Sequence, residues 1–435
     1  MKSNRTDSHE TVFMRHLKRI MAALYTDESN LASQAELFYQ AADTQPANML
    51  PDLLFTAERL LNLSEGATQQ ETLTRSAKIL GSLQLTVPTS IRRWREVQFS
   101  YKPIYRAVLA LRLLDHALEH NQLTDALLQG YYAARQPNDA DCQYRLYVQM
   151  PLVMAILLLD AGLQHSQTAA ILYGNQIQQL DPLRAMSGEE RTEFNSVNQA
   201  ARLLLAKKGL QPTAYRGNCK LQQQQHQHSQ QQQIQLIQQI LQQVENSESL
   251  LGNIVKIPQV YSSVVLPGRN RFRYETLPKV ALILKQAAKR KQIDALLVDQ
   301  LLRITGIFPQ GYGITFLPKQ LDISSQEKYE LAIVNQLYPT SPEQPLCRVV
   351  SRNLHYRRGG QNCQISVDYN LYFKPARDKL TIMPEARLRE ILTKLSADWQ
   401  PGQLRRLVPR YWQPNEFFSH SEQQNLWNQA AKVLN

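Results

Sequence analysis

The chain has 435 residues, of which 43% are hydrophobic and 20% charged, with a formal net charge of +12. This composition supports two or three domains with a real hydrophobic core and excludes a disordered, collagen-like or coiled-coil chain. Sixteen glycines are few for this length, which disfavours sandwiches, barrels and propellers, and four scattered cysteines without a CxxC pair argue against a disulfide scaffold. The mild basic bias is compatible with an anionic ligand.

Residues 1–95 predict a helical N-terminal region, because apolar side chains such as Leu17, Ile20 and Leu24 recur at helical spacing. The start of the sequence lacks the apolar stretch of a signal peptide. No apolar run approaches the roughly 20 residues that a membrane span needs, so we expect a cytoplasmic protein.

A second helical unit is predicted over residues 96–305. A linker-like stretch between Pro88 and Pro103 separates it from the first. An amphipathic helix over 104–123 and a helix apolar nearly all round from Pro151 to Gly162 then follow. The segment that ends at Gly209 is acidic at its start and basic at its end, as helices favour.

The composition changes abruptly at a glutamine tract, LQQQQHQHSQQQQIQLIQQILQQV. We interpret residues 221–243 as an insertion with a flexible or frayed start. The tract passes into an amphipathic helix, because Ile234, Ile237 and Leu241 fall on one face. His226 and His228 within it do not form a preorganised metal site.

From Gly306 the apolar period changes from helical to alternating, which predicts a small antiparallel β-subdomain over residues 306–375. The segment GYG at 311–313 is interpreted as a turn between helix and strand. Residues 376–435 return to helical patterns, so we expect C-terminal helices there.

One spacing could carry metal chemistry. HALEH places His116 and His120 on one helix face, with Glu119 between them, as in an inverted zinc-peptidase motif. The alternative is that both histidines simply end an amphipathic helix, where a cationic side chain is favourable. The sequence lacks the dinucleotide-binding, P-loop, nucleophile-elbow and HExxH motifs.

Three collinear blocks resemble an HD-GYP domain, a bacterial signalling family of metal-dependent phosphodiesterases. They begin LLLDAGLQHSQ (157–167), LLGNIVKIPQVYSS (250–263) and ITGIFPQGYGITF (304–316), and the resemblance covers roughly residues 104–355. It implies an HD-domain-like helical bundle followed by a small β-extension.

The departures from the family pattern bear on activity, because its metals are held by histidine and aspartate. The resemblance aligns the HD doublet with Leu159 and Asp160, and the catalytic lysine with Leu163. A later histidine falls near Asn198 and a later aspartate on Gln259, while the glutamine tract replaces the remaining histidine block. Amides do not supply the ligands that a two-metal site requires. We name these five residues the HD positions.

The resemblance therefore predicts a catalytically inactive regulatory or scaffolding protein without a metal or other cofactor. Its partner would be another signalling protein, such as a diguanylate cyclase, or a cyclic dinucleotide. Arg269, Arg271 and Arg273 occupy the region where the family contacts phosphate and could bind such an anion, although an exposed basic loop is equally compatible with RNRFRY.

Two alternatives remain. The chain could be a divergent metal-dependent phosphohydrolase in which His116, His120, Asp160 and His165 converge on a rearranged site. It could also bind nucleic acid through arginines interleaved with aromatics at 92–96 and 404–412, although no motif of a nucleic-acid module is present.

Overall fold

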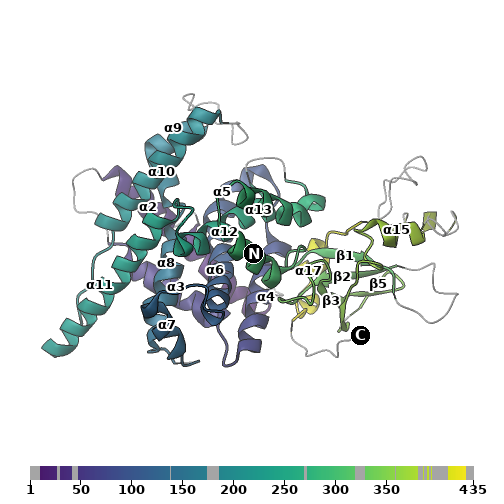
Figure 1. Cartoon of the computed structure of the whole chain (residues 1–435), viewed down its shortest axis with the longest axis horizontal. Coiled ribbons are helices and arrows are strands. Elements are labelled where there is room, and N and C mark those ends of the chain that lie inside the picture. The colour runs from purple at the N-terminus through teal and green to yellow at the C-terminus, as the bar shows by residue number, and fades with distance from the viewer. Residues whose placement is uncertain are drawn as a thin grey trace, which may run out of the picture.

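The computed structural model has a helical body with a small β-sheet at one end (Figure 1). The structure describes residues 10–26, 30–41, 48–137, 139–173, 186–268, 272–318, 329–357, 359–380, 386, 389–390, 393 and 410–427. The expectation of a mainly helical chain with a small antiparallel sheet near its C-terminus is confirmed.

The helical body comprises a series of helices, with α6 near its middle in the chain order. In chain order they are α1 (Val12–Leu24), α2 (Leu31–Gln40), α3 (Leu50–Ser64), α4 (Gln69–Thr86), α5 (Trp94–Glu96), α6 (Lys102–Glu119), α7 (Ala126–Ala133), α8 (Met150–Leu158), α9 (Ser166–Tyr173), α10 (Gly188–Lys208), α11 (Lys220–Gln243), α12 (Leu250–Val265), α13 (Val280–Lys289) and α14 (Ala295–Thr305). Capping side chains mark the first turn of several of these helices. Ser187 and Glu190 form a capping box at the start of α10, and Asp294 caps the start of α14.

Helix α6 lies at the centre of this body (Figure 1) and is buried on nearly every side by α4, α8, α12 and α14. It continues without a break from 3₁₀-helix η1 (Ile91–Arg93), α5 and π-helical turn η2 (Val97–Tyr101). Pro103 has no N–H to donate, so a regular α-helical bond is missing at this point. The linker-like stretch is therefore helical from Ile91 onward, and the proposed boundary at residue 95 falls inside this continuous run. One hydrophobic core includes side chains from Met14 to Trp427.

Helix α8 is the most apolar element. The segment Arg145–Gln164, which also includes the π-helical turn η3 (Arg145–Gln149) and the 3₁₀-helix η4 (Ala161–Gln164), is 20 residues long with a mean hydropathy of 1.8. By length and composition alone it would suffice to cross a membrane. In the fold, 89% of its most apolar window is buried, and α3, α6 and α11 cover it.

The glutamine tract forms one continuous helix, α11, along the side of the body next to α8 and α10 (Figure 1). The expectation of a flexible or frayed start was wrong, because the helix begins at Lys220. Glutamine is a good helix former, and its amides can also bond to neighbouring elements. Gln233 donates to the Leu146 carbonyl at 2.9 Å, and Gln238 donates to the Ala206 carbonyl at 3.0 Å. The tract is thus part of the helical packing.

The sheet has the antiparallel order β1–β2–β3–β6, with a separate hairpin of β4 and β5. Its strands are β1 (Gly313–Phe316), β2 (Glu330–Val334), β3 (Leu346–Val349), β4 (Ser351–Arg352), β5 (His355–Tyr356) and β6 (Asn362–Gln364). The turn interpretation of the GYG segment is confirmed: Gly311 has φ +84°, and a side chain at Gly313 would collide with the backbone of Trp412.

The described C-terminal residues tie the sheet to the helical body. Trp412 pairs with Gly313 and donates from its indole to the Ala332 carbonyl at 2.9 Å, while Asn415 donates to the Leu85 carbonyl of α4 at 2.9 Å. The helices here are short. They are α15 (Lys374–Leu380), α17 (Asn415–Ser419) and the 3₁₀-helix η9 (Ser421–Gln423). Most of residues 381–409 and all of residues 428–435, where further C-terminal helices are expected, lie outside the described residues.

Candidate functional site

The carboxylate at the HD doublet forms a buried ion pair. Asp160 lies between α8 and η4 with 6% of its surface exposed. It contacts the guanidinium of Arg106, a residue of α6 that is 3% exposed, with an N–O distance of 2.5 Å. The amide of Gln98 donates to the same carboxylate oxygen at 2.8 Å. One positive charge therefore balances the charge of Asp160, and Arg106 and Gln98 both occupy the same carboxylate oxygen.

The surroundings of Asp160 include two other HD positions. A side chain at Gly162, two residues after Asp160, would collide with Asn198 of α10, so α10 crosses close to this turn. Arg106 also donates to the hydroxyl of Ser262 at 2.9 Å, on the same turn of α12 that carries Gln259. Arg106 thus joins Asp160 to residues 259–262 of α12, and Asn198 of α10 lies beside Gly162, although these segments are far apart in the sequence.

These neighbours offer weak metal ligands. The buried amide oxygens of Asn198 and Gln259 have no hydrogen-bond partner in the described part of the chain. Leu159 is fully buried, and Leu163 lines a pocket of about 310 Å³ with Trp94 and Tyr39. Neutral amides and aliphatic side chains provide neither anionic nor imidazole ligands. The arrangement fits a packed polar junction.

The four side chains predicted to form a rearranged phosphohydrolase site do not all lie close together. Asp160 pairs with Arg106, and His116 lies ten residues further along α6, a rise of about 15 Å. The ring of His165 packs edge-on against Tyr39. Within the described ranges, the one group of three or more residues spaced to hold a metal is His116, Glu119 and His120.

The basic segments singled out in the sequence are largely engaged elsewhere or outside the described residues. Arg269 and Arg271 lie outside them, and Arg273 is exposed. In the 92–96 segment, Arg93 forms an ion pair with Glu96, and the Trp94 ring lies 5.8 Å from that of Tyr173. Most of the 404–412 segment is likewise outside the described part. Anion and nucleic-acid binding at these places stay predictions.

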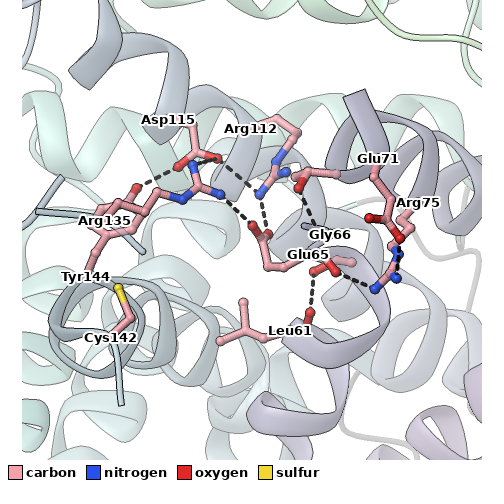
Figure 2. A network of polar contacts seen from close by, with 12 residues as sticks. Leu61, Glu65, Gly66, Glu71, Arg75, Arg112, Asp115, Arg135, Cys142 and Tyr144 are labelled. Carbon is pink, nitrogen blue, oxygen red and sulfur yellow. Dashed lines mark hydrogen bonds and ion pairs between the residues drawn. The ribbon is translucent and has the colours of Figure 1, made fainter. Parts of the chain in front are cut away.

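A second polar site lies at the C-terminal half of α6 and was not predicted from the sequence (Figure 2). Arg112, 2% exposed, contacts the carboxylate of Glu65 and lies 3.1 Å from that of Asp115. Arg135 bridges the same two carboxylates at 2.9 and 3.6 Å, and the hydroxyl of Tyr144 donates to Asp115 at 2.6 Å. Figure 2 shows the two guanidinium groups on either side of the two acids.

The charges of this network balance, two against two. Burial alone would lower the pKa of Arg112, but Glu65 and Asp115 outweigh it and raise that pKa. The network borders a cavity of about 180 Å³ that His116, Glu119 and Tyr338 also line. The sequence signal for it was the presence of Arg112 and Asp115 within an otherwise apolar helix, because charges at buried positions require partners.

Comparisons with models of known protein families, with curated proteins and with solved structures find no match for this chain.

Proposed function

We propose that this chain is a catalytically inactive, HD-GYP-like regulatory protein that acts by binding another signalling component. The observation that carries the proposal is the buried contact between Arg106 and Asp160. Two of the three motif blocks that resemble the family supply Asp160, Asn198 and Gln259. Arg106 of α6 also donates to Ser262 of α12, and Asn198 of α10 lies beside Gly162, two residues after Asp160. The acid that would hold a metal in an active member holds an arginine here.

The pairing has a functional consequence. Two-metal hydrolysis needs ions that activate water and stabilise the leaving oxygen. A guanidinium is a fixed cation that cannot be deprotonated at neutral pH and has no open coordination position for water. The junction therefore favours a structural role, and regulation would come from surfaces that bind a partner or a cyclic dinucleotide.

The proposal is tested by a hydrolysis assay. The protein is purified without chelator and incubated with cyclic-di-GMP in the presence of added Mn²⁺ or Fe²⁺, beside an active phosphodiesterase of the HD-GYP family. We expect no turnover and no difference between the wild type and Asp160→Asn. Metal-dependent turnover by the wild type would overturn the proposal, and its loss in an Asp160→Asn variant that circular dichroism shows to be folded would place the catalytic metal at Asp160.

Binding is measured separately by titration calorimetry with cyclic-di-GMP and with a purified diguanylate cyclase. We expect saturable binding of one of the two. If neither binds, the regulatory part of the proposal fails, while the absence of catalysis stands on the assay above.

A further inference from the structure

Three side chains with metal-binding atoms gather at the C-terminal end of α6. His116, Glu119 and His120 are spaced i, i+3 and i+4, so they share one face of the helix. One ligand atom from each lies within 4.8 Å of the other two, and the imidazole rings lie 4.1 Å apart. Ligands of a tetrahedral zinc lie roughly 3.3 Å apart. The exposed side chain of Glu119 can rotate to close the remaining distance.

Both imidazoles are already oriented by their other nitrogen. Nδ1 of His120 lies 2.8 Å from the His116 carbonyl oxygen, and Nδ1 of His116 lies 3.1 Å from the Tyr338 hydroxyl. These contacts leave Nε2 of each ring for a ligand, and Nε2 of His116 is buried without a hydrogen-bond partner in the described structure. A metal-binding histidine usually has its second nitrogen held by a carbonyl or similar group, which fixes the ring.

The charge around these rings suits a cation. Glu65 and Asp115 balance Arg112 and Arg135, which leaves the carboxylate of Glu119 in excess beside the cavity. The charge that opposes a cation is Arg303 of α14, which acts on His116.

We propose that His116, Glu119 and His120 form a binding site for one divalent zinc ion, with water completing its coordination. Two imidazoles and one carboxylate form a donor set that suits zinc. The site is independent of Asp160 and of the proposed function. Tyr338 follows β2, and its N–H donates to the Ile304 carbonyl at 2.8 Å, so a bound ion would fix the end of α6 against the junction of α14 with the sheet.

The test is a zinc titration of the full chain without a polyhistidine tag. The protein is first treated with a chelator to remove any bound metal, and the chelator is then removed. We expect one zinc per chain, measured by competition with a fluorescent indicator, and a rise in the melting temperature. His120→Gln and Glu119→Gln change exposed residues and should fold, and each should weaken binding by roughly tenfold or more. Co²⁺ in place of zinc should give visible absorption bands that His120→Gln abolishes.

The matched control is His228→Gln in α11. His226 and His228 are two residues apart, on different faces of that helix, and His226 Nε2 lies 3.1 Å from the Thr213 hydroxyl. This variant should bind zinc like the wild type. Absence of saturable binding at micromolar zinc would overturn the proposal, as would unchanged affinity in the His120→Gln and Glu119→Gln variants. Neither result affects the proposed function, which the hydrolysis assay tests.

Discussion

Buried charges are paired differently in the two halves of α6. Near its N-terminus, Arg106 and Asp160 form one ion pair, with Gln98 and Ser262 satisfying further polar atoms. Near its C-terminus, Arg112 belongs to a larger network in which two guanidinium groups share two carboxylates, and Nε2 of His116 has no hydrogen-bond partner among the described residues. The first half is closed around its charges, whereas the second retains a donor beside a cavity. The difference shows that the presence of an acid alone does not indicate a metal site, because its partner decides its chemistry.

The largest effect is expected when the closed pair loses one partner. Arg106→Met should lower the free energy of unfolding by about 3–5 kcal/mol, because Asp160 would remain buried without a counter-charge. The double variant Arg106→Met with Asp160→Leu removes both charges and should recover most of that loss. Urea denaturation of the wild type, the two single variants Arg106→Met and Asp160→Leu, and the double variant measures the cycle. A double variant as unstable as the single one would show that Asp160 and Arg106 are not energetically coupled.

The network around Arg112 should be destabilised less by the loss of one charge than the Arg106–Asp160 pair. Arg112→Met leaves Glu65 and Asp115 with Arg135 as a remaining partner, so we expect a loss of about 2–3 kcal/mol, less than for Arg106→Met. The same denaturation experiment checks it. If Arg112→Met costs more than Arg106→Met, Arg135 does not compensate, and the contrast between the two halves of α6 is lost.

The proposed zinc site can be tested further through Tyr338, whose hydroxyl orients the ring of His116. Tyr338→Phe removes the hydroxyl that holds His116 without removing a ligand, so zinc affinity should fall by about tenfold. Arg303→Gln should instead tighten binding, because it removes the opposing positive charge. Indicator competition measures both affinities. Unchanged affinity in both variants would mean that the ion does not bind beside His116.

The smallest effect is expected at an ion pair that is partly open to solvent. Glu245 contacts Arg202 and Lys256, and 34% of its side chain is exposed. Burial alone would raise the pKa of Glu245, but Lys256 and Arg202 outweigh it and hold that pKa below its usual range. Lys256→Gln removes the more exposed partner and leaves Glu245 paired with the buried Arg202, so it should cost about 0.5–1 kcal/mol at pH 7.

The pH dependence of that cost has a defined sign. A carboxyl group with a lowered pKa in the folded state stabilises above its unfolded pKa and loses this contribution as the pH falls. The stability difference between Lys256→Gln and the wild type should therefore be full at pH 7 and vanish in acid, where Glu245 is protonated. High salt should also reduce it, because this pair is partly exposed. A difference that grows in acid would contradict the assignment.

Local patterns in the sequence were sufficient to predict much of the fold. The period of apolar residues and the capping residues predicted the helices around Pro151 and up to Gly209, and the change of period at Gly306 predicted the sheet. The start of the glutamine tract was misjudged because the helix propensity of glutamine was given too little weight; its side chains there are mostly exposed. The segment between Pro88 and Pro103 was misjudged because it is held as helix by contacts with distant elements, such as that of Gln98 with Asp160. Tertiary contacts of this kind leave no local pattern.

The candidate sites show the same limit. The sequence identified Asp160 and the HALEH spacing, but it could not show that Arg106 would pair with Asp160 or that Tyr338 would orient His116. Those partners lie 54 and 222 positions away along the chain. The role of Arg112 was not predicted from the sequence because its partner Glu65 follows the end of a different helix, α3. Charge pairing across a fold depends on topology, which residue spacing does not encode.

The most direct measurement is a crystal structure of the protein grown with Mn²⁺ and Zn²⁺, recorded at wavelengths where each metal scatters anomalously. The account predicts that Arg106 contacts Asp160 and that no anomalous peak lies beside that carboxylate. A metal peak within about 2.2 Å of a carboxylate oxygen of Asp160, with Arg106 displaced, would contradict it.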